Sequence, residues 1–544
     1  MTQKQPTEKP QCHIHDDLRE YEINSIRLNV CVNDLPPTEY SDGKHYCLFH
    51  LPTREKDAEK FREVFEARLE EIGAKISEIE VHPEEAASRK ISYDFRHVWF
   101  PAKVDLRNQT FSTDADFSSV FFSADADFRS AAFSAKVFFS SAAFSANAYF
   151  TSATFSANAY FSSVTFSARA YFRSAAFSAD AYFSSASFST HADFSSTSFS
   201  ANADFRSTSF SAYAYFDSVF FSANADFRSA AFSANANFRS ATFSANADFR
   251  SAKFEESSQI FFSNTKFKAL ADFEYAVFTG YVSFESARGE KMFKQKENKE
   301  VILNLQNARL EKPERISFHR VNLRPGWFVN VDSRKMVFTD VDWDGIEPKR
   351  RNTNITSEIR SLEKRGISEP SRLLEIACRQ LAVNAEENNR YEEAAKFRYM
   401  AMETKRLEYK GWFPFLTLNW WYRLSSGYGE NWKQAGIVLS LILVFFGVLF
   451  WSSLSKFDYG ELKAAVLKQD SIEREIEAVA NDAKRFHSMN IGEGMVHSLY
   501  IAALQRPEPK AADTLTKFFV IMETILGPLQ AALLALAIRR KFMR

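Results

Sequence analysis

Phenylalanine recurs through the middle of this chain at spacings that alternate between six and five residues, and this regularity restricts the fold more than any other feature. One set of phenylalanines repeats every 11 residues from Phe111 to Phe254, and a second set repeats from Phe117 to Phe249. A six-residue step turns an α-helix by about 600°, so the two sets would lie on separate helix stripes roughly 120° apart. The intervening Ser, Asn, Asp and Thr residues also disfavour helix interiors, because they hydrogen-bond the local backbone. The pattern therefore predicts short extended segments.

Each extended segment would point one small residue and one phenylalanine to the same side. The residue two before each phenylalanine of the second set is alanine from Ala115 to Ala247, except for Val137. Residues i−2 and i share one face of a strand. A single segment cannot bury that face, so successive segments must stack as the coils of a solenoid. The predicted interior ladder includes Phe117, Phe122, Phe128, Phe133, Phe205, Phe210, Phe227 and Phe232.

The segments ADFRS, AAFSA, ADFSS and AYFRS resemble the pentapeptide repeat, in which Ala–Asp/Asn–Leu/Phe precedes two polar residues. The resemblance implies a right-handed quadrilateral β-helix with stacked phenylalanines inside. The extra residue in every second unit departs from the family pattern, and we interpret it as a slack corner that gives about 22 residues per coil instead of about 20. Residues 95–284 would then form between eight and nine coils, a rod of about 40 Å at the usual strand spacing.

The repeat domain is predicted to span residues 91–286, with final coils and a cap over 287–345. Two extra residues near EESSQIFF shift the register of the repeat. Further on, a strict five-residue spacing predicts one or two closing coils, carried by Phe318, Leu323, Phe328, Phe338 and Trp343.

Charge restricts what the rod can bind. The chain has 68 basic and 68 acidic residues, and residues 105–253 contain eleven Asp and ten Lys plus Arg without an acidic stripe. This disfavours nucleic-acid binding, and it disfavours the DNA mimicry that the family resemblance would otherwise allow. We expect a spacer or a docking surface for a protein partner. The sequence has no phosphate-binding glycine loop and no nucleophile elbow, so we do not predict an enzyme.

Residues 1–90 are predicted to form a small α/β domain with two Cys-x-x-His pairs. Cys12 with His15 and Cys47 with His50 supply four ligands of the kinds that structural zinc prefers. The alternative is that they are ordinary core or surface residues, and His13, His45 and Cys31 are substitute ligands. With four cysteines in the whole chain and no apolar stretch at the N-terminus, we expect a reducing compartment and no cleaved signal peptide.

A helix is predicted after these pairs, over REKDAEKFREVFEARLEEIGAKI. Ala58, Phe61, Phe65 and Leu69 recur at helical spacing on one face. Since the first coil of a solenoid exposes apolar residues and strand edges, we expect this helix to cap it.

Two helices joined near 388–390 are predicted within residues 346–411, followed by an interfacial linker over 412–433. The linker has an aromatic cluster of the kind found at membrane interfaces, namely Trp420, Trp421, Tyr422, Tyr428 and Trp432. RQLAVNAEENNRYEEAAKFRYMAME followed by YRLSSGYGENW resembles bacterial pentapeptide-repeat membrane proteins. In those proteins this linker joins the β-helix to a C-terminal two-helix ion-channel-like domain.

Two transmembrane helices are predicted, over 434–455 and 514–539. The first has no charged residue and is long enough for a hydrocarbon core of about 30 Å. Basic residues precede the first span and follow the second in a tail over 540–544. By the positive-inside rule, both chain ends and the β-helix would lie in the cytoplasm. The membrane would be the inner (plasma) membrane of the cell. The loop 456–513 would face the other side.

A short apolar helix is predicted over 495–504, just before the second span. A two-helix cation-channel subunit has the same order of elements, a span, a short helix and a second span. The segment ETILGPLQAALLALAIRRKF resembles the inner helix of that family. The potassium-filter sequence is replaced by QRPEPKAAD, so potassium selectivity is not predicted.

Three features of the second span have two interpretations each. Glu523 is either part of a pore-lining ring or a helix–helix hydrogen-bond partner. Gly527 and Pro528 form either a hinge or a tolerated kink, and Gln530 is the other polar residue of the span.

Two functions follow from this layout. The first, which we favour, is an oligomeric ion-channel-like pore gated through the β-helix, a tetramer if the channel likeness holds. The second is a non-conducting membrane-tethered scaffold. The position of segment 495–504 distinguishes the two functions. A position beside the spans favours the pore, and a position in solvent favours the scaffold.

Overall fold

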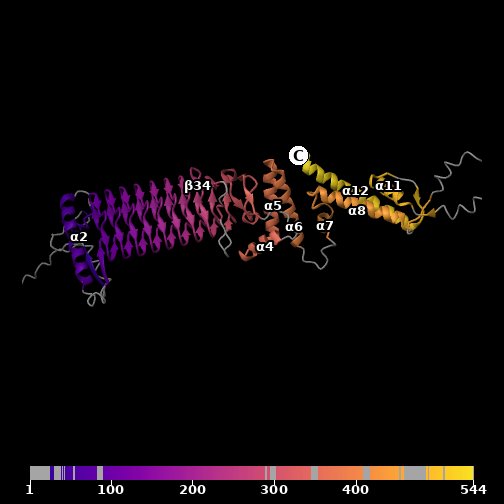
Figure 1. Cartoon of the computed structure of the whole chain (residues 1–544). Helices are drawn as coiled ribbons and strands as arrows, with labels where there is room; N and C mark the ends of the chain where they lie inside the picture. Colours follow the sequence, from indigo (N-terminus) through magenta and orange to yellow (C-terminus); the bar gives the residue numbers. More distant parts are fainter. Residues whose placement is uncertain are drawn as a thin grey trace, which may run out of the picture. The chain divides into compact units, whose positions relative to one another are not determined.

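The protein forms two compact units, Met1–Gly345 and Ile346–Arg544. The first unit is a β-solenoid preceded by a helix, and the second is mainly helical (Figure 1). The computed structural model describes residues 25–29, 38–39, 41, 43–52, 56–81, 90–287, 291–293, 302–344, 353–408, 417–452, 455–458, 486–487, 489–505 and 509–542.

Each coil of the solenoid has four short strands, and each strand pairs in parallel with the strand one coil further on. One coil consists of β8 (Asp114–Asp116), β9 (Phe121–Phe122), β10 (Ala126–Asp127) and β11 (Ala132–Phe133), after which β12 (Val137–Phe138) pairs with β8. The strands stack into four sheets, two with 11 strands, one with 10 and one with 8. The solenoid therefore has about 11 turns of about 22 residues, and the predicted fold class is confirmed.

The solenoid extends beyond residues 95–284 at both ends. Before them, β1 (Ser25–Asn29) pairs with β4 (Lys90–Asp94). After them come β39 (Ile302–Asn304), β41 (Ile316–His319) and β43 (Val337–Thr339). Phe318 pairs with Phe338, so the last coil keeps the shorter repeat. The two-residue insertion lies before β34 (Gln259–Ser263), where Ala236 pairs with Ile260.

Phenylalanine fills the solenoid interior in stacked columns. The ring of Phe172 lies 4.8 Å from that of Phe150 and 4.9 Å from that of Phe194, nearly parallel to both. It also makes edge-to-face contacts with Phe161 and Phe183. Offset-stacked and edge-to-face pairs are the favourable aromatic geometries. The structure buries every predicted ladder residue, namely Phe117, Phe122, Phe128, Phe133, Phe205, Phe210, Phe227 and Phe232.

The corners of each coil are of two kinds, and the extra residue of every second unit lies in the longer kind. The short corner has a serine in the left-handed region, such as Ser119 at φ 56°. The longer corner has the sequence Ser–Ala–Asx. There the side chain of Asp125 accepts a hydrogen bond from the backbone N–H of Asn147, at 3.0 Å, one coil further on. The extra residue therefore lengthens a corner and gives about 22 residues per coil, as interpreted from the sequence, and a side-chain hydrogen bond holds this corner in place.

The helix α2 (Ala58–Val81) covers the first coil, as the sequence predicts. Its Phe65 ring lies 5.1 Å from that of Phe100 and 5.9 Å from that of Phe95, and Phe61 lies 5.5 Å from Phe100. These contacts bury the apolar end that the first coil would otherwise expose.

The second unit begins with α4 (Thr353–Lys364), α5 (Pro370–Glu387) and α6 (Tyr391–Glu408). After these come the short α7 (Leu418–Ser426) and the apolar α8 (Trp432–Trp451). The helix α11 (Ile491–Ala502) precedes the long α12 (Thr514–Phe542). A small sheet joins β45 (Phe457–Asp458), β46 (Phe486–His487) and β47 (Lys510–Ala511).

Candidate functional site

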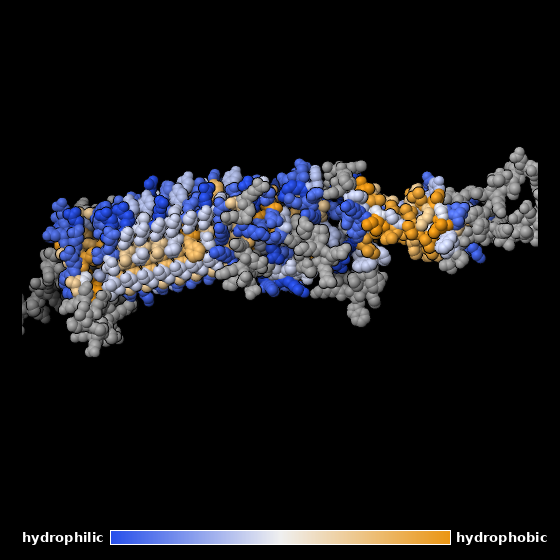
Figure 2. All heavy atoms as spheres, viewed as in Figure 1, coloured by the Kyte–Doolittle hydropathy of each residue, from blue (hydrophilic) through white to orange (hydrophobic). Residues whose placement is uncertain are grey.

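Both α8 and α12 are long and apolar enough to cross a membrane. Only 22% of the most apolar stretch of α8 and 17% of that of α12 is buried, so neither helix is the core of this unit. The exposed side chains are large and apolar, among them Leu441 and Phe445 on α8 and Ile521 and Ile525 on α12. Figure 2 shows this surface as a largely hydrophobic region.

The short helix α11 packs against both α8 and α12 through glycines. A Cβ on Gly494 would lie 2.5 Å from the carbonyl oxygen of Gly447 in α8. A Cβ on Gly527 of α12 would lie 3.0 Å from the Cα of Ala502. Only glycine permits such close backbone approach. Gly527 therefore has a packing role, and α12 continues through Pro528 to residue 542.

Two polar residues of α12, Glu523 and Gln530, point into the unit. Glu523 is fully buried and accepts a hydrogen bond from Ser498 of α11, whose hydroxyl lies 3.1 Å from the carbonyl oxygen of Leu443. The Nε2 of Gln530 donates to the carbonyl oxygens of Ser425 and Ala435, at 2.7 and 2.9 Å. Within one chain, both side chains join helices to one another, which corresponds to the helix–helix interpretation of Glu523.

A turn of three left-handed residues connects α7 to α8. Gly427, Tyr428 and Gly429 have φ values of 54°, 61° and 75°. A tyrosine in this region is strained, and such strain persists only where the surroundings fix it. Tyr428 is 2% exposed. The tyrosine is therefore directed into the protein, and its place at the membrane interface stays a prediction.

Tyr428 and two arginines surround the buried carboxylate of Glu403 on α6. The Tyr428 hydroxyl donates to Glu403 at 2.7 Å, and the guanidinium of Arg406 donates at 2.7 Å. Arg423 lies 3.4 Å away. Burial alone would raise the pKa of Glu403, but the hydrogen bonds from Arg406 and Tyr428 outweigh it and hold the pKa below its ordinary value. Burial and the hydrogen bond to Glu403 raise the pKa of Tyr428.

A second ion-pair group joins the same turn to α6 and α12. Glu430 accepts from Arg398 of α6 at 2.8 Å and from Arg540 of α12 at 2.9 Å. Arg540 also donates to the carbonyl oxygen of Tyr428 at 3.2 Å. The turn therefore links α6 to the end of α12, and we call Glu403, Arg406, Tyr428, Glu430 and Arg540 the junction.

The other predicted interface residues lie on α7 and at the start of α8. Trp421 is exposed, whereas Trp420, Tyr422 and Trp432 are half-buried. Glu403 and Glu430 could not be found from the sequence, because glutamates are common on protein surfaces and the residues that bury these two lie far along the chain. Tyr428 contacts Glu403, and Arg398 and Arg540 contact Glu430.

Of the predicted zinc ligands, Cys12 and His15 lie outside the described residues. Cys47 and His50 lie on one turn, with the Sγ of Cys47 3.2 Å from the Nδ1 of His50. The Nε2 of His50 lies 3.1 Å from the carbonyl oxygen of Arg96. Among the described residues, no three His, Cys, Asp or Glu side chains are grouped to hold a metal ion.

Three successive coils of the solenoid depart from the Ser–Ala–Asx corner at one edge. Arg169, His191 and Tyr213 take the position that Asn147 and Asn235 have in the neighbouring coils. Within residues 90–287, all of which have described backbone, the structure has no side-chain hydrogen bond to the backbone N–H of either His191 or Tyr213. The rings of His191 and Tyr213 stack at 5.2 Å, and Tyr213 is 43% exposed.

The strand β18 (Ala170–Tyr171), which follows this edge, has an arginine without an acidic partner in the corner at each of its ends. Arg169 hydrogen-bonds Tyr171, and both Arg169 and Arg173 are exposed. Most other repeat arginines pair with an aspartate two residues earlier, as Arg206 does with Asp204 at 2.7 Å, although Arg239 follows Asn237 instead. Within residues 90–287 no ion pair joins Arg169 or Arg173 to a carboxylate. Arg169, Tyr171, Arg173, His191 and Tyr213 are called the rod patch below.

Comparison with known proteins supports the repeat assignment. The family model for pentapeptide repeats, with nine copies of the repeat, matches residues 238–288. No curated protein and no solved structure matches the chain.

Proposed function

We propose that this pentapeptide-repeat protein is anchored in a membrane by α8, α11 and α12 and presents its β-solenoid to a protein partner. The observation that carries the anchor is the apolar outer surface of the two long helices, whose polar residues Glu523 and Gln530 are directed inward. Such surfaces are rare on soluble monomers. Basic residues before α8 and after α12 favour a cytoplasmic solenoid.

Membrane extraction tests the anchor. We expect the full chain to stay with membranes in high salt and to need detergent for solubility, whereas a chain ending at residue 408 should be recovered without detergent. A full-length protein that is monodisperse in plain buffer would overturn the proposal.

The rod patch supports a protein partner with carboxylate side chains. The N–H groups of His191 and Tyr213 lose a corner hydrogen bond there, and local rules of a fold are most often broken where a function requires it. Tyrosine and arginine dominate protein-binding hot spots, and the unpaired guanidinium groups of Arg169 and Arg173 fit acidic side chains.

A peptide array of acidic sequences and their amide counterparts tests the rod patch. Full-length protein in detergent should prefer the acidic peptides. The preference should disappear in Arg169→Asn with Arg173→Ser and remain in Lys253→Ser, a control on β33 (Lys253–Phe254). Equal binding to both peptide sets would overturn the docking proposal and leave the anchor unaffected.

A second candidate function is an oligomeric ion-channel-like pore. The observation that favours it is the packing of α11 beside both spans, the layout of a channel subunit. Ion flux through liposomes that contain the protein distinguishes the two functions. Flux that is lost in Gly494→Leu and kept in Val496→Leu, on the exposed side of α11, would establish the pore. Flux equal to that of empty vesicles would favour the anchor.

A further inference from the structure

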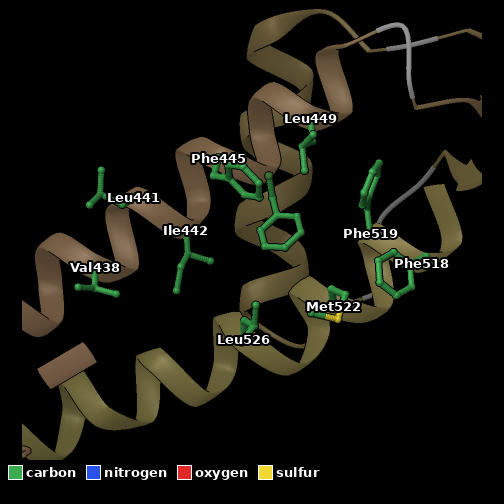
Figure 3. Close-up of a pocket in the computed structure, with 10 residues that line it drawn as sticks. Val438, Leu441, Ile442, Phe445, Leu449, Phe518, Phe519, Met522 and Leu526 are labelled. Carbon is green, nitrogen blue, oxygen red and sulfur yellow. The ribbon is translucent and has the colours of Figure 1, made fainter. Parts of the chain in front are cut away.

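A groove of about 440 Å³ lies between α8 and α12. Its walls include Ile442, Phe445 and Leu449 from α8 and Phe518, Met522 and Leu526 from α12, and nearly all of its lining atoms are apolar. Ile442 and Leu526 point toward each other from the two helices (Figure 3). Binding pockets for small molecules are typically apolar and about 300–1,000 Å³ in volume.

The groove covers about half of the membrane thickness. On α8 its lining extends from Val438 to Leu449, which is about 16 Å along the axis at the usual helical rise. A hydrocarbon core is about 30 Å thick. A helix from a second copy would need a contact surface along the whole span, whereas one acyl chain of one leaflet needs only half of it.

Two lysines border the end of the groove that would lie at the membrane surface. Ser455 donates to the carbonyl oxygen of Leu449 at 2.8 Å, and the N–H of the next residue, Lys456, donates to Thr516 at 2.7 Å. Lys517 follows Thr516 and directly precedes the groove residue Phe518. Both lysine side chains are exposed.

One acidic group, Asp513, lies beside these lysines. The carboxylate of Asp513 accepts from the N–H of Thr516 at 3.3 Å and caps the first turn of α12. In the part of the chain that the structure describes, no ion pair joins Lys456 or Lys517 to a carboxylate. The end of the groove therefore carries two ammonium groups and the carboxylate of Asp513, which is one net positive charge for these three groups, at the level of phospholipid headgroups.

We propose that the groove binds one acyl chain of an anionic phospholipid, with the phosphate held between Lys456 and Lys517. This inference rests on the proposed membrane anchor. The apolar walls recognise the chain, the depth of the groove matches one leaflet, and the two ammonium groups select the headgroup charge.

Native mass spectrometry of the detergent-purified full chain tests this site, with phosphatidylglycerol and phosphatidylcholine as probes. We expect phosphatidylglycerol to be retained preferentially. Each lysine is expected to contribute about fivefold to that preference, so Lys456→Gln with Lys517→Gln should remove most of it. Lys433→Gln, at the other end of α8, should leave it unchanged.

A groove-filling variant tests the acyl chain. Leu526→Trp should reduce retention of both lipids, whereas Ile437→Trp, on the exposed side of α8, should not. Because Leu526→Trp could disturb folding, the unmodified protein is also irradiated with a phosphatidylglycerol that carries a photoreactive acyl chain. Cross-links should fall on peptides containing Ile442 or Leu526.

Several outcomes would overturn the lipid site. The first is equal lipid retention by Leu526→Trp and Ile437→Trp. The second is a set of cross-links spread evenly over the exposed faces of α8 and α12. The third is a groove-filling variant that loses a dimer without losing lipid, which would identify a second copy as the occupant. Each of these leaves the anchor standing, because the protein would still require detergent.

Discussion

Replacing Arg169 with asparagine should complete the side-chain ladder at the corner where the rod patch interrupts it. In the preceding coils Asp125 accepts from the N–H of Asn147 at 3.0 Å, and Asn147 accepts from the N–H of Arg169 at 3.3 Å. The new asparagine should accept from the N–H of His191 in the same way. One such hydrogen bond contributes about 0.5–1.5 kcal/mol, so amide exchange at residue 191 should slow by about 2- to 13-fold.

Hydrogen–deuterium exchange, resolved to the peptide that contains residue 191, measures this effect. Arg169→Ala is the matched control, because it removes the guanidinium and supplies no acceptor. The reasoning is refuted if the two variants slow amide exchange equally. It is also refuted if Arg169→Asn leaves the exchange rate at residue 191 the same as in the parent protein.

Four further predictions concern the core, the junction and α11. Phe172→Ala should destabilise the solenoid by about 3–5 kcal/mol in denaturant unfolding, whereas Phe138→Ala, on the outer face, should cost far less. Tyr428→Phe should cost about 1.5–3 kcal/mol, because it removes a hydrogen bond to a charged group. Since the folded pKa of Glu403 is lowered, its contribution is complete above the ordinary carboxyl pKa of about 4.3 and is lost as the pH falls through the folded value. The acid loss of thermal stability should therefore be smaller in Glu403→Gln than in the parent. Gly494→Ala should destabilise the membrane unit by about 1–3 kcal/mol through overpacking, while Gly492→Ala, whose Cβ would meet nothing closer than 3.4 Å, should be nearly neutral in a detergent melt.

The solenoid could be predicted from the sequence because its core repeats with one period. The spacing alone predicts that Phe117 and Phe128 lie in the interior, and in any other fold these residues would not share one core. The side-chain ladder at the longer corner was not predicted, for a local reason. Its hydrogen bond joins Asp125 to Asn147, and this link becomes visible in the sequence only once the 22-residue coil is used as the alignment length.

The junction could not be predicted, since its residues come from two helices, α6 and α12, and from the turn between α7 and α8. Tyr428 belongs to an aromatic cluster beside an apolar helix, which is typical of a membrane interface. Its burial depends on a partner, Glu403, whose place is set by the packing of α6. The apolar spans were found from composition, but the inward direction of Glu523 depends on Ser498 of another helix.

The uniform register of the coils makes the length of the solenoid adjustable. Ala148 pairs with Ala170 and Ala170 pairs with Ala192 through the same backbone geometry. If residues 159–180 were excised, Asn158 would precede Ala181, the strands on either side would meet equivalent partners, and the aromatic columns would close without a gap. Duplication of such a block would be tolerated for the same reason. Descendants of this gene can therefore change how far the solenoid extends in increments of about 4.8 Å, without redesigning either terminus.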